Sequence, residues 1–327
     1  MPWTRREAIA GCGGALALLT GLPAFAEAAY PSQTIKLIVP YPAGGTTDLL
    51  GRMVADQLQI GLHGTVIVEN KPGAGTTIGA EQVARAQPDG YTLLLATSTT
   101  LAINKTLYRN LPYDPVKDFA PIALVAGVPF ALIVNPSLPV KTLPEFIAYA
   151  KSKPGLAYGS AGNGSPQHLG AEMLKSAAGI EIRHVAYRGS VAAMLDVIAG
   201  HISFMVVDLQ PALPQIAEGK LRVLGVTTPQ RVTSAPDIPT LAESGLPGFE
   251  LVAWQGVVGP AGLPRPIVDQ LAAQIGKLVA DTGTRDKFKL LALEPLPPST
   301  PDSFAEYVKS EVDRWATIVK NSGAEPE

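Results

Sequence analysis

The stretch Ile35–Val54, IKLIVPYPAGGTTDLLGRMV, decides the fold. It begins with an apolar run, Ile35–Val39, that predicts a buried strand, and it ends with apolar residues at helical spacing. Between them, the small residues around Gly44 and Gly45 predict a tight turn. The first N–H groups of the following helix lack internal partners, and the helix dipole adds positive charge there. The turn is therefore a candidate site for a carboxylate or a phosphate.

The rest of the chain repeats this alternation of short strands and helices. Such alternation predicts an α/β fold with parallel-rich sheets, in which ligands bind at the carboxyl ends of strands. The predicted strands are Ile35–Val39, Thr65–Glu69, Tyr91–Ala96, Ile122–Val125, Leu132–Val134, Ala157–Gly159, Ile182–Val185, Phe204–Val207, Val223–Val226 and Gly256–Val258. The predicted helices are Thr47–Gln59, Thr76–Ala86, Leu143–Ser152, Gln167–Ala177, Val191–Ala199, Pro266–Thr282 and Thr300–Lys320.

Composition sets the class of protein. The chain has 327 residues, of which 46% are hydrophobic and 17% are charged, as in an ordered globular protein with a sizeable core. The formal net charge is −2. Nucleic-acid binding needs a concentrated positive face, which this sequence lacks, so no nucleic-acid partner is expected.

The first 26 or so residues predict a signal peptide. Arg5 and Arg6 form a charged start, Ala15–Leu22 is apolar, and cleavage is expected near Ala26, which predicts a periplasmic protein. The arginine pair fits twin-arginine export or an ordinary basic start. Cleavage removes Cys12, the only cysteine, so disulfides, thiol nucleophiles and thiolate metal sites are not expected. Neither a metal nor another cofactor is predicted, since no histidine pair has ligand-type spacing.

Two segments are predicted to cross between lobes: Phe130–Pro136 and Trp254–Pro260. A chain that crosses out and back suggests two α/β lobes around a cleft. The expected division is residues 27–130 plus 255–327 for the first lobe and 131–254 for the second.

Four further strand ends carry small or polar residues that could face this cleft. The turn from Ser160 to His168 again opens a helix, and Arg188 could clamp a carboxylate at two points. Each loop also fits an ordinary capped turn or a polar surface loop, but several at equivalent strand ends favour one shared anion site. The predicted ligand-binding residues are Tyr41, Ala43, Gly44, Gly45, Thr46, Thr47, Asp48, Thr97, Ser98, Thr99, Ser160, Gly162, Asn163, Gly164, Ser165, His168, Tyr187, Arg188, Gly189, Ser190 and Asp208.

Six motifs, in order, resemble one known family over nearly the whole mature chain. They are PSQTIKLIVPYPAGGTTDLLGR from Pro31, ENKPGAGTTIGAEQVARAQPDGYTLL from Glu69, GSAGNGSPQHLGAEM from Gly159, VAYRGS from Val185, LRVLGVTT from Leu221 and WQGVVGPAGLP from Trp254. The chain is similar to the Bug-type periplasmic receptors of tripartite tricarboxylate transporters.

The resemblance implies a two-lobe, Venus-flytrap binding protein of the type II periplasmic-binding-protein fold, not an enzyme. It implies a small carboxylate ligand, such as a di- or tricarboxylate, an aromatic acid or an acidic amino acid. The expected partners are membrane permease subunits, and a monomer is expected. The family often has Ala where Gly51 stands and Pro where Ala186 and Val191 stand, so ligand identity does not carry over.

Two enzyme classes are the alternatives. Gly73–Gly79 follows a strand and opens a helix, but its G-x-G-x-x-x-G spacing is one residue too long for the dinucleotide fingerprint. Ser160 or Ser165 with His168 and Asp208 has the residue types of a serine hydrolase, although the mature chain has no Gly-x-Ser-x-Gly elbow.

Overall fold

The computed structural model describes residues 30–322. The predicted signal peptide, its cleavage point near Ala26 and Cys12 lie outside the described residues. Within residues 30–322, no helix combines the length and the apolar character needed to span a bilayer.

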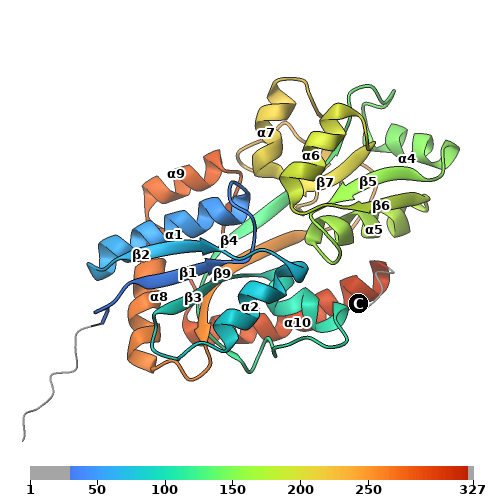
Figure 1. Ribbon diagram of the computed structural model, residues 1–327. Coiled ribbons are helices and arrows are strands. Elements are labelled where there is room, and N and C mark those ends of the chain that lie inside the picture. The colour runs from blue at the N-terminus through green and yellow to red at the C-terminus, as the bar shows by residue number, and fades with distance from the viewer. Residues whose placement is uncertain (1–29, 323–327) are drawn as a thin grey trace, which may run out of the picture.

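The first lobe is built on parallel strands β1, β2 and β3. β1 pairs in parallel with both neighbours, and its residues Leu37, Ile38 and Val39 are fully buried. Helices flank this sheet, and α1 packs against α8 (Figure 1). The bounds are β1 Ile35–Val39, α1 Thr46–Leu62, β2 Val66–Asn70, η1 Ala74–Thr76, α2 Thr77–Ala84, β3 Thr92–Thr97, η2 Thr99–Ile103, α3 Asn104–Leu107, α8 Arg265–Ala280, α9 Thr282–Leu290, β10 Glu294–Pro295 and α10 Pro301–Ser322.

The second lobe repeats the arrangement with β5, β6 and β7. β5 pairs in parallel with β6 and with β7, and helices α4 to α7 surround this smaller sheet (Figure 1). The bounds are α4 Leu143–Ser152, β5 Leu156–Ser160, α5 Pro166–Ala178, β6 Ile182–Ala186, α6 Ser190–Ala199, β7 Phe204–Asp208, α7 Leu209–Ala217 and β8 Arg222–Val226.

One long strand, β4 (Phe119–Val134), belongs to both lobes. Its first part, through Pro129, pairs antiparallel with β9 (Val252–Pro260), and from Phe130 onward it pairs with β7. Figure 1 shows β4 running from one lobe into the other. The strand order is β2-β1-β3-β9-β4-β7-β5-β6, so the sheet is mixed and the fold is the expected two-lobe α/β fold.

The sequence prediction was wrong about β4 and incomplete about the helices. β4 was expected as two short strands, because Gly127 and Pro129 interrupt the apolar run; pairing with β9 keeps the segment extended through both residues. Helix α7 was not predicted, since it contains two prolines, of which Pro214 lies inside it. The short helices at residues 99–107 and helix α9 were also missed.

Candidate ligand-binding site

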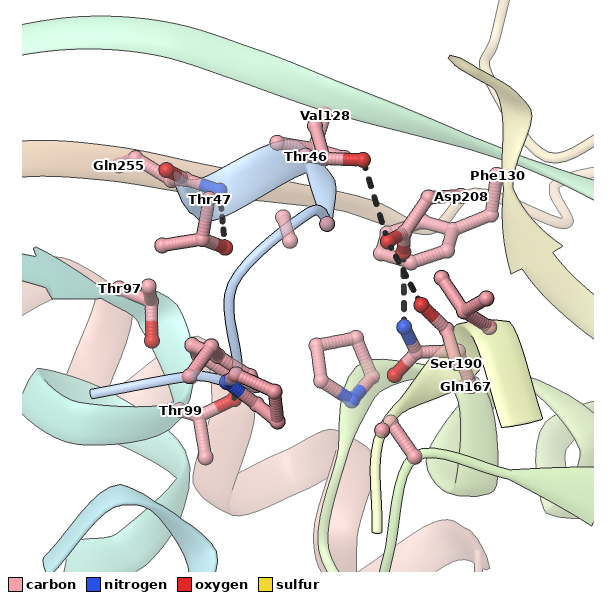
Figure 2. Close-up of a pocket in the computed structure, with 18 of the residues that line it drawn as sticks. Thr46, Thr47, Thr97, Thr99, Val128, Phe130, Gln167, Ser190, Asp208 and Gln255 are labelled. Atoms are coloured by element: carbon pink, nitrogen blue, oxygen red, sulfur yellow. Dashed lines mark hydrogen bonds between the residues drawn. The ribbon is translucent and has the colours of Figure 1, made fainter. Parts of the chain in front are cut away.

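A cavity lies where the two lobes meet. It encloses about 700 Å³ of empty space, part of which is open solvent. Figure 2 shows side chains of both lobes around it. Its lining is Tyr41, Pro42, Ala43, Gly45, Thr46, Thr47, Thr97, Ser98, Thr99, Val128, Phe130, Ala161, Pro166, Gln167, Arg188, Gly189, Ser190, Val191, Ala192, Asp208, Ala253, Trp254 and Gln255.

The start of α1 lies at this cavity. Its N-cap is Gly45, which has no side chain to accept a hydrogen bond from the first turn. The next two residues, Thr46 and Thr47, also line the cavity. The first N–H groups of a helix have no partner within the helix, so an uncapped start favours an anion.

Asp48 shapes the turn and is not part of the cavity lining. Its carboxylate accepts hydrogen bonds from the Gly44 N–H at 2.9 Å, from the Asn70 side chain at 3.0 Å and from two nitrogens of Arg52 at 3.1 Å. Burial acts to raise the pKa of Asp48, but these hydrogen bonds hold the pKa below its usual value. The carboxylate thus faces the loop and its neighbours.

The start of α6 provides a second uncapped helix end, from the other lobe. Gly189 is its N-cap at φ 108°, a left-handed conformation that favours glycine, and no side chain caps the helix. Ser190, Val191 and Ala192, the first residues of the helix, line the cavity. By contrast, α5 is capped by Ser165, whose hydroxyl accepts a hydrogen bond from the His168 N–H at 3.3 Å.

Asp208, at the end of β7, joins these elements. Its Oδ1 accepts a hydrogen bond from the Gln167 side chain at 2.7 Å, and its Oδ2 accepts from the hydroxyls of Thr46 and Ser190, each at 3.3 Å (Figure 2). Burial raises the pKa of Asp208 to about 6, against an opposing effect of the hydrogen bonds. The bond to Thr46 links the two lobes directly.

The back of the cavity comes from β4 and β9. The Gln255 side chain donates to the Thr47 hydroxyl at 3.0 Å, and the indole N–H of Trp254 donates to the buried carboxylate of Glu311 on α10 at 2.6 Å. Phe130, Trp254 and Gln255 were predicted to lie in the crossing segments, with no ligand contact. Pro42, Ala161, Pro166 and Gln167 lie within the predicted loops but were not named as ligand-binding residues, and Val128, Val191, Ala192 and Ala253 were not predicted.

A second cavity, with about 1,320 Å³ of empty space that includes open solvent, adjoins the first and shares six lining residues with it: Tyr41, Pro42, Thr99, Ala161, Arg188 and Gly189. Four more predicted residues line this second cavity: Gly162, Asn163, Ser165 and Tyr187. Gly44, Asp48, Ser160, Gly164 and His168 line neither cavity. The structure therefore brings most of the predicted residues to the cleft, divided between two adjoining spaces.

The side chains proposed for a hydrolase form no Ser-His-Asp triad: the Ser165 hydroxyl bonds to the backbone N–H of His168, as the cap of α5, and not to its ring. Ser160 contacts His184 at 2.6 Å, while the ring of His168 stacks on His184 with centroids 4.0 Å apart. Asp208 bonds to Gln167, Thr46 and Ser190 instead. Burial lowers the pKa of each histidine to about 4, so both rings are neutral at pH 7. Among the described residues, no group of three or more His, Cys, Asp or Glu could hold a metal ion.

Two α/β lobes that share a strand, with helix starts facing a cavity between them, define a two-lobe solute-binding protein. The family model of TctC, the tripartite tricarboxylate transporter family receptor, matches residues 50–324, and the chain belongs to this family.

Three solved structures are similar to the chain. R. palustris Rpa4515 with adipate is 34% identical, with a TM-score of 0.88, covering 91% of this chain and all of that one. The periplasmic binding protein BugD is 37% identical, with a TM-score of 0.85 and the same coverage. MatC from Rhodopseudomonas palustris, with bound malate, is 32% identical, with a TM-score of 0.83, covering 89% of this chain and all of that one. The chain is thus a solute-binding receptor of the TctC and Bug type.

Proposed function

We propose that the cleft captures a small organic carboxylate and presents it to the permease subunits of a tripartite tricarboxylate-type transporter. The observation that carries this proposal is that two uncapped helix starts, at Gly45 of one lobe and Gly189 of the other, face one cavity. Hydrogen bonds from N–H groups to a carboxylate are charge-assisted and stronger than neutral ones. The adipate and malate in the similar structures support this class of ligand.

We infer that the protein works by closure of the two lobes on the ligand. A ligand held by α1 and α6 together favours the closed arrangement over an open one, which is how hinge-bending receptors respond. We place the hinge at the change of pairing in β4 and keep the predicted division into residues 27–130 plus 255–327 and 131–254. We further propose a monomer, exported to the periplasm with cleavage near Ala26.

Isothermal titration of the chain lacking residues 1–26 tests the ligand class. The panel comprises succinate, adipate, malate, citrate, aspartate and benzoate, with adipamide and succinamide as uncharged controls of matched shape. We expect at least one acid to bind with a Kd in the micromolar range or below, and its diamide to bind at least about 100-fold more weakly. A panel in which no acid binds, or in which a diamide binds as well as its acid, would contradict the proposal.

Transport is tested separately. Deletion of the gene should abolish uptake of the radiolabelled acid identified by titration, and the exported protein should restore it. Uptake that persists at the wild-type rate after deletion would show that this chain does not serve the transporter for that acid.

A further inference from the structure

The cavity that we propose for a carboxylate already contains one. Asp208 is only 9% exposed and lies among the lining residues. Arg188 also lines the cavity, but within residues 30–322 no ion pair joins Asp208 to Arg188 or to any other cation. A ligand carboxylate placed directly against Asp208 would meet a like charge in a setting that screens it poorly.

The two oxygens of Asp208 are satisfied unequally. Oδ1 has a short bond from Gln167 at 2.7 Å, whereas Oδ2 has only two bonds of 3.3 Å, from the neutral hydroxyls of Thr46 and Ser190. O–H···O bonds usually measure about 2.5–3.0 Å, so both contacts to Oδ2 are long. Oδ2 is therefore the oxygen that gains most from a further hydrogen-bond donor.

Other polar groups of the same cavity lack partners as well. The Ser98 hydroxyl, which is fully buried, has no hydrogen-bond partner among the described residues, and neither does Oε1 of Gln255, which is 4% exposed. Whichever way the Gln255 amide is turned, one of its polar atoms stays unpaired. Buried polar groups without partners are costly, so the walls of this cavity retain unmet hydrogen-bonding capacity.

We propose that the ligand carries a hydroxyl or ammonium group close to its bound carboxylate, and that Asp208 selects such hydroxy- or amino-carboxylates over the unsubstituted acids. The inference rests on the proposed function. Thr46 and Ser190 are the first residues of α1 and α6, and both contact Asp208 Oδ2. A carboxylate on the N–H groups of these helices would thus place a substituent on its α or β carbon within reach of Oδ2.

The test compares matched acids by isothermal titration at pH 7.5. The first series is succinate, malate and aspartate, which share one carbon skeleton and differ at one substituent. Two longer series follow the same scheme: glutarate, 2-hydroxyglutarate and glutamate, and then adipate and 2-aminoadipate. In at least one series, we expect the hydroxy or amino acid to bind at least about tenfold more tightly than the unsubstituted acid.

Asp208→Asn provides the decisive variant, because it keeps the size of the side chain and removes its charge. We expect it to reduce the preference within a series to less than about threefold, chiefly by improving the unsubstituted acid. Thr97→Val is the matched control, since Thr97 lines the same cavity and its hydroxyl pairs with Thr100 rather than Asp208. This control should shift both acids of a series alike. A thermal melt confirms that each variant is folded.

Three results would overturn the inference. The unsubstituted acids could bind the wild-type protein as tightly as their hydroxy and amino counterparts. The preference could survive in Asp208→Asn. Unsubstituted acids could instead bind best and weaken about tenfold per pH unit above pH 6, which would mean that a protonated Asp208 donates to the ligand. Binding of acids without any preference leaves the proposed function standing, whereas a failure of every acid to bind would remove both.

Discussion

The start of α1 offers a perturbation that separates ligand binding from folding. Gly45 is the N-cap at φ −88° and ψ 173°, an ordinary extended conformation, and a Cβ added there would meet no atom within 4 Å. Aspartate at this position can therefore accept hydrogen bonds from the first-turn N–H groups, as N-cap residues do. Gly45→Asp would place within the chain the carboxylate that we propose the ligand supplies.

Gly45→Asp should hardly change the free energy of unfolding but should greatly weaken ligand binding. The cap and the helix dipole each contribute a few tenths to about 1 kcal/mol, opposed by the charges of Asp48 and Asp208, so the free energy of unfolding should change by less than about 1 kcal/mol. A ligand that loses two charge-assisted hydrogen bonds, worth roughly 1.5–3 kcal/mol each, should lose about 3–6 kcal/mol of binding free energy. At about 1.4 kcal/mol per decade, that is a 100-fold or greater rise in Kd.

Isothermal titration and urea unfolding of Gly45→Asp, Gly45→Asn and Gly45→Ala form the assay. Alanine adds the same Cβ without an acceptor, so Gly45→Ala should keep its Kd within about tenfold while being roughly 1 kcal/mol less stable than Gly45→Asp. Asparagine caps without charge and should also lose affinity. If alanine weakens binding as much as aspartate does, the effect is steric; if Gly45→Asp binds normally, these N–H groups do not hold the ligand. Either result refutes the reasoning.

Three further changes test the surroundings of the site. Glu311→Ala should lower the free energy of unfolding by about 2–4 kcal/mol, because the buried indole N–H of Trp254 loses its acceptor; Glu311→Gln should recover part of this in urea melts. Burial lowers the pKa of His168 and His184 to about 4, so the unfolded chain takes up protons first as the pH falls. Thermal melts should therefore show stability that is intact above pH 6.5 and declines toward pH 4, by up to about 3 kcal/mol for His168, and His168→Phe should flatten this decline. Burial raises the pKa of Asp208 to about 6, so its ionised form opposes folding. Asp208→Asn should therefore stabilise the protein by up to about 3 kcal/mol at pH 7 but hardly at pH 4. Equal gains in stability at both pH values would contradict this.

The sequence by itself determined the parts of the fold that depend on local signals. Apolar runs, glycines and helical spacing identified β1 at its observed bounds, the turn at Gly44 and Gly45, and the start of α1 within one residue, although α1 continues three residues past the predicted end at Gln59. The same signals at other strand ends selected residues of which most line one of the two adjoining cavities. These features depend on the conformational preferences of neighbouring residues, which any stretch of the chain carries with it.

Only the tertiary structure decided how these parts combine. Thr46 and Asp208 are 162 residues apart in the sequence yet share a hydrogen bond, and Gln255 reaches the cavity because β9 pairs with β3 and β4. Asp48 lies at the start of a helix that faces the cavity, but its side chain turns back to Arg52 and Asn70. Such contacts depend on strand order and on the packing of distant segments, which no local pattern records. Local sequence patterns therefore predicted the loops, whereas the pairing of β4 with strands of both lobes brings these loops to one cavity.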